Sequence, residues 1–205
     1  MALPDVTGYS GYMTSAGMVL RSHTGVEYRF DPGALCLELL VTGGPGPYRR
    51  YEVLHAPDDL VAWAERSRLT PTPRLRVTAE HVAAARRFRD ALLRVVHAPT
   101  PDGADLEVVN AAARRPALAP VIGPGGAKAW AGEPDGEQLL ATVARDAVEL
   151  LTGAFAHRVR TCSAADCRLV YVDTSRPGSR RWCSMEHCGN RHKVRAARAR
   201  RTEGG

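Results

Sequence analysis

Apolar residues recur at helical spacing in several stretches of this chain, and they predict a mostly helical body. The clearest stretch is Thr78–His97, where apolar side chains fall on one face and charged ones on the other. A long amphipathic helix is expected from Asp135, its N-cap, to about His157, with Gln138 at the reciprocal capping-box position. Shorter helices are expected at Ala34–Thr42, Pro57–Leu69 and Asp105–Arg114. The polar side of the Thr78–His97 helix, expected to face solvent, carries Arg86, Arg87, Arg89 and Arg94.

Short runs between these helices predict strands, so the fold class expected is α+β. The strands are expected at Met18–Leu20, Val26–Phe30, Pro116–Ile122 and Ala127–Trp130. Residues 1–29 are otherwise rich in Gly, Ser and Thr, which is typical of a loose lead-in. Residues 30–156 carry enough periodic apolar surface to form a core of their own.

Charge is distributed unevenly along the chain. The net charge of +6 comes from 26 Arg and 2 Lys against 22 acidic residues. Residues 157–205 carry 12 basic and 4 acidic side chains, whereas residues 1–156 carry 16 and 18. A near-neutral body therefore precedes a strongly basic tail, which favours a polyanionic partner for the tail.

The beginning of the chain shows no pattern of a secretion signal or a membrane anchor. It lacks a cationic stretch followed by an apolar run. The longest apolar stretch, Ala34–Val41, is interrupted by Glu38 and is too short to cross a bilayer. We therefore expect a cytoplasmic protein without membrane contact.

Four of the five cysteines form the strongest pattern in the sequence, Cys162-x4-Cys167-x15-Cys183-x4-Cys188. Two close pairs separated by a hairpin-length spacer can bring four thiolates to one tetrahedral ion, and soft ligands favour zinc. With all four positions filled by the protein, the zinc is expected to be structural. The odd cysteine count argues against a disulfide framework, and the x4 spacings are poor for a redox motif. His187 or His192 remains an alternative to one cysteine, and Cys36 is expected to be a small buried apolar residue.

The residues around the cysteines predict a β-hairpin followed by a helix. Arg168–Asp173 reads as a strand, Ser175–Ser179 as a turn, and Arg180–Trp182 returns to the second pair of cysteines. Ser184 can cap a helix that begins just after Cys183. Only about 45 residues surround the cysteines, too few for a stable core without a metal, so removal of the ion should unfold this unit.

These residues resemble the CGNR zinc-finger proteins. The resemblance covers about residues 158–200 and rests on Val170-Tyr-Val-Asp-Thr-Ser-Arg176, Arg180-Arg-Trp-Cys-Ser-Met185 and Cys188-Gly-Asn-Arg191. Such proteins typically carry an N-terminal ABATE domain, a module of stress-induced transcription regulators, and residues 30–155 are similar to it in size, position and helical character. The resemblance implies DNA binding and transcriptional regulation.

The expected organisation therefore has three parts. Residues 1–29 are a variable extension, residues 30–156 an ABATE-like, mostly helical domain with a few short strands, and residues 157–205 a small treble-clef-like zinc finger. In this finger Cys162, Cys167, Cys183 and Cys188 bind one Zn²⁺, and a basic helix follows.

The basic tail contains the residue types that bind nucleic acid. Arg191, Arg195 and Arg198 form one stripe of the terminal helix, and Lys193 and Arg200 lie nearly opposite. Guanidinium groups bind phosphates bidentately and read guanine edges. The candidate DNA contacts are Arg180, Arg181, Arg191, Lys193, Arg195 and Arg198. A structural alternative is that Arg180, Arg181 and Arg191 neutralise the thiolates, and that Asn190 holds backbone and Trp182 packs over the zinc site.

The function expected from these features is a zinc-dependent, DNA-binding transcriptional regulator. Its body would sense a small-molecule effector or form a homodimer. The alternative is a protein-interaction module in which the zinc unit is purely structural. The sequence contains no nucleophile elbow and no His-Glu-x-x-His motif, so we do not expect an enzyme.

Overall fold

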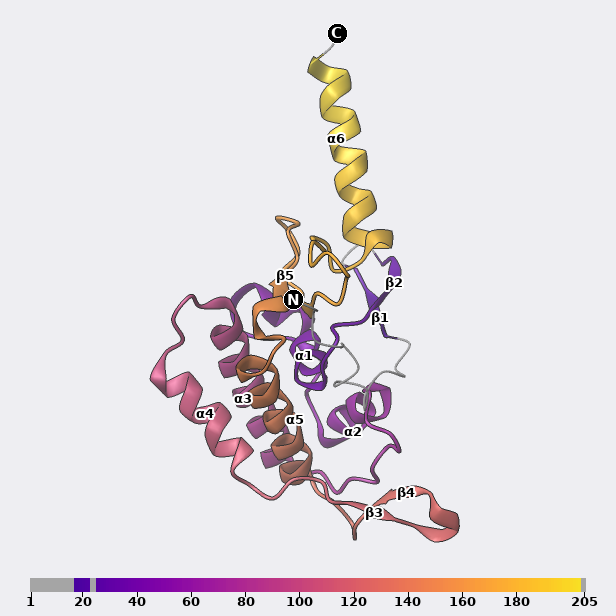
Figure 1. Ribbon diagram of the computed structural model, residues 1–205, viewed down its shortest axis with the longest axis vertical. Helices are drawn as coiled ribbons and strands as arrows, with labels where there is room; N and C mark the ends of the chain where they lie inside the picture. Colours follow the sequence, from indigo (N-terminus) through magenta and orange to yellow (C-terminus); the bar gives the residue numbers. More distant parts are fainter. Residues whose placement is uncertain (1–16, 23–24, 204–205) are drawn as a thin grey trace, which may run out of the picture.

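The structure is a computed structural model that describes residues 17–22 and 25–203, and about half of the chain is helical (Figure 1). The body contains α1 (Leu35–Leu39), α2 (Pro57–Arg66), α3 (Ala79–His97), α4 (Gly103–Ala113) and α5 (Gly136–Thr152). Its 3₁₀ turns are η2 (Leu40–Thr42), η3 (Gly46–Tyr51), η4 (Pro124–Gly126) and η5 (Ala156–Arg158). A π-helical turn, η6 (Met185–Gly189), leads into the terminal helix α6 (Asn190–Glu203).

The described strands pair as three separate antiparallel ribbons. They are β1 (Met18–Arg21) with β2 (Glu27–Phe30), β3 (Pro120–Ile122) with β4 (Lys128–Trp130), and β5 (Val159–Thr161) with β6 (Val170–Val172). The β3–β4 ribbon extends from the end of the body opposite α6 (Figure 1). These findings confirm the expected α+β class, in which helices dominate and strands are short.

The core of the body lies between the long helices. In Figure 1, α3, α4 and α5 run side by side, and α1 lies next to α5. Helices α2, α3 and α5 each bury an apolar stripe, as the helical spacing in the sequence predicts. The largest side chains that are almost completely buried include Trp63, Phe88, Leu92 and Leu139. Among the described residues, no helix is long and apolar enough to span a membrane.

Helix boundaries follow local capping chemistry. The backbone N–H of Gln138 donates to Asp135 Oδ1 at 3.0 Å, and the N–H of Asp135 donates to Gln138 Oε1 at 3.1 Å, which confirms the expected capping box of α5. However, α5 ends at Thr152 rather than near His157, because Gly153 leaves the helical conformation. Helix α2 similarly ends at Arg66, before the expected Leu69.

Helix α1 is buried on all sides and is capped by a residue far away in the sequence. Its own N-cap, Ala34, has no side-chain acceptor, and Asp146 of α5 instead accepts a hydrogen bond from the N–H of Cys36 at 2.8 Å. A carboxylate there also compensates the positive end of the helix dipole. Cys36 itself is fully buried, as expected.

One charged residue of α3 was expected at the surface but is buried. The side chain of Arg89 is 1% exposed, and its guanidinium forms two hydrogen bonds of 2.8 Å with the carboxylate of Glu52. Asp90 also accepts from Arg89 Nε at 2.9 Å. The expectation of a wholly solvated arginine face was therefore wrong for this residue, because a partner 37 residues away supplies the charge and hydrogen bonds that burial requires.

A second buried ion pair joins α1 to the segment after α2. Glu38, which is inaccessible to solvent, accepts from both the backbone N–H and Nε of Arg68 at 2.9 Å. Arg68 also donates to Asp31 at 2.8 Å. Burial raises the pKa of Glu38 even though Arg68 opposes the rise. Trp63 Nε1 donates to the carbonyl of Glu38 at 3.1 Å, so this network fixes α1 against α2.

Removing the carboxylate of Glu52 should destabilise the body. In Glu52→Ala, the buried guanidinium of Arg89 loses its bidentate partner, and we expect the free energy of unfolding to fall by about 3 kcal/mol. Urea denaturation followed by circular dichroism measures this. The matched control is Arg86→Ala, since Arg86 also contacts Glu52, at 3.4 Å, but is 48% exposed. Its loss should cost less than about 1 kcal/mol. Equal losses in the two variants would contradict a special role for the buried pair.

Candidate metal centre and basic helix

The four clustered cysteines of the sequence meet at one point in the structure. One ligand atom from each of Cys162, Cys167, Cys183 and Cys188 lies within 4.8 Å of the others, and the Sγ atoms of Cys167 and Cys183 are 3.7 Å apart. Four thiolates bound to zinc at about 2.3 Å would be separated by about 3.8 Å. The donor set and its spacing therefore fit a tetrahedral zinc ion. Among the described residues this is the one His, Cys, Asp or Glu cluster suited to a metal.

The four sulfurs interact strongly with one another, and their proton affinities differ. Hydrogen bonds from the neighbouring thiols, Cys167 first, lower the pKa of Cys162, whereas hydrogen bonds from the neighbouring thiols, Cys162 first, raise the pKa of Cys183. The backbone N–H of Cys183 also donates to Cys162 Sγ, at 3.4 Å. Three of the four cysteines are buried and Cys167 is half-buried, so little solvent reaches the site.

The first pair of cysteines lies on the turn between β5 and β6. Cys162 directly follows β5, and its N–H donates to the carbonyl of Leu169 at 2.9 Å. The N–H of Cys167 donates to Ala164 at 3.0 Å and closes the turn. The expected strand at Arg168–Asp173 is confirmed in its central part, but its partner is β5, which precedes the cysteines. Arg180–Trp182 is not a strand.

Asp173, which the sequence reasoning did not single out, organises the loop between the two cysteine pairs. Its carboxylate accepts from the N–H and hydroxyl of Ser175, at 2.9 and 2.6 Å, and from the N–H of Arg180 at 2.9 Å. Burial raises the pKa of Asp173, but these hydrogen bonds outweigh it and hold the pKa below its usual value. The pattern Asp-Thr-Ser in an otherwise polar loop is a signal for such a turn.

The second pair of cysteines lies at the start of the terminal helix. The helical region begins at Met185, as expected, but its first turn is π-helical and the Ser184 hydroxyl does not cap it. The carbonyl of Ser184 instead accepts from the N–H of Gly189 at 3.0 Å. A Cβ at Gly189 would approach the Met185 side chain to 2.8 Å, so a larger residue here would require that side chain to move. Asn190 Nδ2 donates to the carbonyl of Glu186 at 3.3 Å, so the amide holds backbone, as the structural alternative predicted.

The finger is covered by the β1–β2 ribbon, which confirms the two strands expected at Met18–Leu20 and Val26–Phe30. Phe30 at the end of β2 is 1% exposed and packs in one cluster with Tyr171 and three of the cysteines. The ring of Tyr28 stacks on that of His187, with centroids 4.2 Å apart and planes 8° apart. The N–H of Val172 donates to the carbonyl of Pro32 at 2.8 Å. The finger and the ribbon therefore share one apolar core.

Two of the six candidate DNA contacts are engaged inside the finger. Arg180 lies 4.0 Å from the ring centroid of Tyr171 and donates to the carbonyls of Trp182 and Cys183. Arg191 forms an ion pair with Asp166 of the first turn and contacts His187. Trp182 packs against the cysteine cluster and against the ring of His192, as expected.

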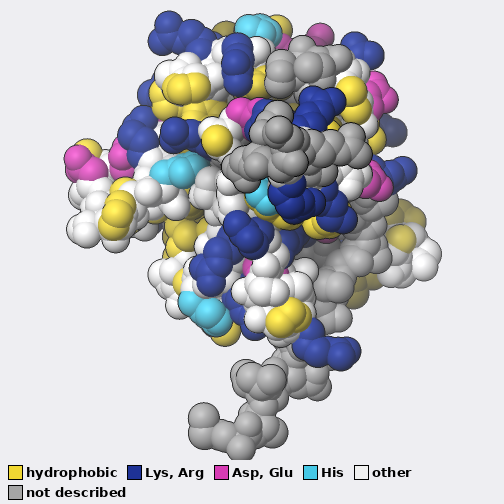
Figure 2. Space-filling model, turned by 90° about the horizontal axis from the view of Figure 1, so that it is seen from above, with side chains coloured by type: hydrophobic (Ala, Val, Ile, Leu, Met, Phe, Trp, Pro, Cys, Tyr) yellow, Lys and Arg dark blue, Asp and Glu magenta, His cyan; other side chains and the backbone are white. Residues whose placement is uncertain are grey.

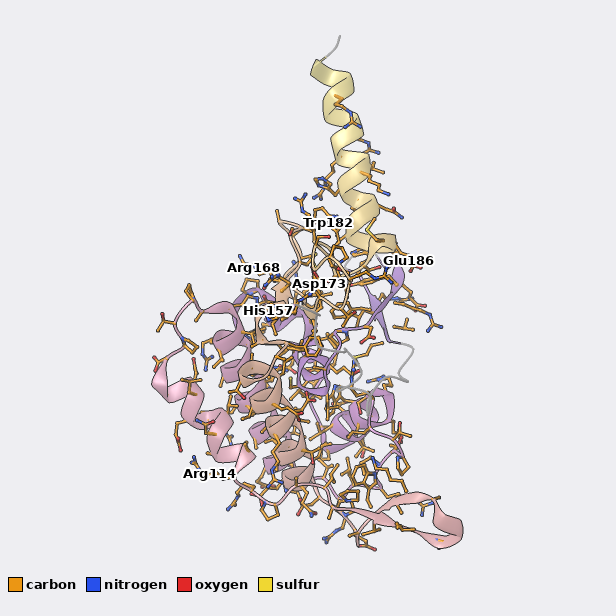
Figure 3. All side chains as sticks on the ribbon, in the orientation of Figure 1. Arg114, His157, Arg168, Asp173, Trp182 and Glu186 are labelled. Atoms are coloured by element: carbon orange, nitrogen blue, oxygen red, sulfur yellow. The ribbon has the colours of Figure 1, made fainter. Side chains whose placement is uncertain are left out.

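The other four candidates are exposed. They are Arg181, Lys193, Arg195 and Arg198. Arg195 also approaches Asp166, at 3.3 Å, but its side chain is 62% exposed. Helix α6 projects away from the rest of the molecule, beyond the labelled Trp182 and Glu186 (Figures 1 and 3). Seen from this end, Lys and Arg side chains are prominent on the surface around it (Figure 2).

Comparison with known protein families accounts for both parts of the chain. Residues 33–154 match the family model of ABATE, described as a putative stress-induced transcription regulator. Residues 158–201 match that of the CGNR zinc finger. The chain belongs to the ABATE family. This confirms the resemblance inferred from the C-terminal motif. No curated protein matches the chain.

In this ABATE protein the four cysteines form the site of one structural zinc ion. All four ligands come from the chain, and three are buried, which leaves no open position for a substrate. Bound zinc would link the turn after β5 to the first turn of the terminal helix. Of the alternative ligands, His187 instead stacks on Tyr28, and the ring of His192 packs against Trp182 with the two planes tilted by 32°.

Substitution of one ligand should abolish the metal site. We expect the purified protein to contain one zinc per chain and Cys183→Ser to contain almost none, because three thiolates bind zinc much more weakly than four. Elemental analysis measures the metal. Cys36→Ala is the control, since this cysteine lies in the body core and should leave zinc content unchanged. Equal zinc content in Cys183→Ser and the wild type would contradict the assignment.

Proposed function

We propose that this protein is a DNA-binding transcriptional regulator whose zinc finger presents α6 to the double helix. The observation that carries the proposal is the position of α6: a helix rich in arginine extends from a zinc-stabilised base, and no other element of the described residues lies beside it (Figure 1). The family descriptions support a regulatory role.

The dimensions and charge of α6 suit the major groove of DNA. Its 14 residues span about 21 Å, and the major groove is about 12 Å wide and admits one helix. Arg195 and Arg198 share one stripe of α6, whereas Lys193 lies on the opposite side. A helix with basic side chains on more than one side can contact the phosphates on both sides of the groove.

The charge of α6 also favours the binding of an anion from outside the chain. Like charges three or four residues apart destabilise a helix, and Arg191, Arg195 and Arg198 have this spacing. Asp166 compensates the first two of them. Phosphates along a bound duplex would lower the repulsion among these cations, so DNA binding should also stabilise the helix.

The engaged arginines divide the candidate contacts into two groups. Arg180 and Arg191 support the finger, and we assign to Arg181, Lys193, Arg195 and Arg198 the contacts with DNA. Phosphate contacts would supply affinity, and any base contact by Arg195 or Arg198 would supply sequence preference.

Replacing Arg195 and Arg198 by alanine should weaken DNA binding and leave the fold and zinc content unchanged. Fluorescence anisotropy with a mixed-sequence duplex, titrated from low to high salt, measures both the affinity and its salt dependence. The slope of log K against log salt should become shallower by about two, since each phosphate contact contributes about 0.9. The matched control is Arg114→Ala with Arg115→Ala, which removes the same charge at the end of α4, far from α6 (Figure 3).

Two results would contradict the proposal. One is the absence of binding at low salt by zinc-loaded, folded protein, and this would favour the alternative of a protein-interaction module. The other is an equal loss of affinity in the α6 variant and in the α4 control, because it would mean that only net charge matters. Loss of binding on zinc chelation would place the interface in the finger.

A further inference from the structure

A hollow of about 670 Å³ lies at the junction of the body and the finger. The β1–β2 ribbon forms one wall, η2 and η3 with the residues after them form another, and the first cysteine turn together with His187 and Arg191 forms the third. This volume is in the range of pockets that bind small organic molecules. The hollow thus lies between the two family domains, at the base of α6.

The deeper wall of the hollow is apolar. It is lined by side chains of the body core that are almost fully buried, Leu37, Leu40, Trp63 and Leu93. Three tyrosines, Tyr28, Tyr48 and Tyr51, add aromatic surface. The hydroxyl of Tyr48 is buried and, among the described residues, has no hydrogen-bond partner. An occupant with an aromatic or apolar body would suit this wall, and a polar atom on it could satisfy Tyr48.

The charged groups that line the hollow are mostly cationic. Its two carboxylates already have partners: Glu52 binds Arg89 and Arg86, and Asp166 binds Arg191 and Arg195. By contrast, three exposed arginines that line it, Arg50, Arg66 and Arg168, have no carboxylate within 4.0 Å in the described part of the chain. Arg168, labelled in Figure 3, comes from the finger, and the other two come from the body. The hollow therefore has an uncompensated positive potential.

We propose that this hollow binds a small organic anion, with an aromatic or apolar body against the tyrosines and leucines and its acidic group held by the exposed arginines that line the hollow. Carboxylate, sulfonate and phosphate groups share the chemistry that guanidinium recognises. An apolar wall next to such cations selects molecules that carry both features over inorganic anions.

Binding of an anion in the hollow would change the contacts at the base of α6. Asp166 and Arg191 line the hollow, and the same pair ties the first turn of α6 to the first cysteine turn. An anion that also reached Arg191 would compete with Asp166 for this guanidinium and change the charge at the base of the helix. This step rests on the proposed function, whereas binding of the anion itself does not.

The test uses 8-anilinonaphthalene-1-sulfonate, an aromatic anion that fluoresces in apolar sites, with the full-length, zinc-loaded protein and no DNA. We expect saturable binding that is weakened at least about tenfold in Arg50→Glu with Arg66→Glu, because two attractive charges become repulsive. Both residues are remote in sequence from the cysteines, and circular dichroism and zinc content verify the fold. The control, Arg74→Glu with Arg114→Glu, makes the same change at exposed residues outside the hollow.

A neutral analogue distinguishes the contribution of charge to probe binding from the contribution of apolar contact. N-phenyl-1-naphthylamine lacks the sulfonate, so its binding should be the same in both double variants, and inorganic phosphate should displace neither probe. Absence of sulfonate binding, or equal weakening in the pocket variant and the control, would overturn the proposal. A subsequent DNA titration with and without the sulfonate tests the link to α6. Unchanged DNA affinity would contradict the link and leave the anion site standing, and absence of DNA binding would contradict only the proposed function.

Discussion

The convergence of four thiolates is the constraint on which the C-terminal half of the molecule depends. The cysteines belong to two turns separated by a polar loop, and the fully buried apolar side chains of their cluster, apart from the cysteines, are Phe30 and Tyr171 among the described residues. Four thiols packed this closely contribute little cohesion by themselves, whereas four bonds to zinc supply the folding free energy of such a unit. The direction of α6 is set where the second turn meets the first, so the metal also determines how the basic helix is presented.

The negative charge of the zinc site determines which of the nearby arginines are engaged inside the finger. A zinc ion with four thiolates carries a net charge of about −2, which must be compensated when the site is buried. Arg191 lies close enough to Cys188 and Cys167 for their negative charge to raise its pKa, in addition to the ion pair with Asp166. Arg180 is held by carbonyls and by the ring of Tyr171. The candidate cations that remain exposed are Arg181, in the loop before Cys183, and those further along α6.

Short-range patterns predicted much of this structure. The periodicity of Thr78–His97 gave α3 to within one residue, and the Asp135 capping box gave the start of α5. The cysteine spacing predicted the metal site because pairs of ligands close in sequence leave few arrangements open. The burial of Arg89 was not predictable from α3, since its partner Glu52 lies in another segment and a charged residue on a helix is usually solvated.

Pairing between distant segments could not be predicted either, because the partner of each residue lies in another segment of the chain. Nothing local indicates that β6 pairs with the three residues before Cys162, or that Phe30 belongs to the core of the finger. The two strands of the β1–β2 ribbon were expected from the sequence, but such a ribbon is stable only when it packs on another element, and that element was not predicted. Its alternation of exposed and buried residues has meaning only once the finger is in place.

The contacts of Phe30, Tyr28 and Val172 make the finger continuous with the body, although the family models treat the two as separate domains. A finger on a flexible tether would bind DNA independently of any event in the body. Here α6 begins one turn after His187, whose ring stacks on the β1–β2 ribbon, and the ribbon also forms a wall of the hollow. An occupant can redirect α6 only to the extent that it binds one arrangement of these elements better than another. The ion pair of Asp166 and Arg191 is the contact through which such a difference would act, because it lines the hollow and joins the two halves of the zinc site.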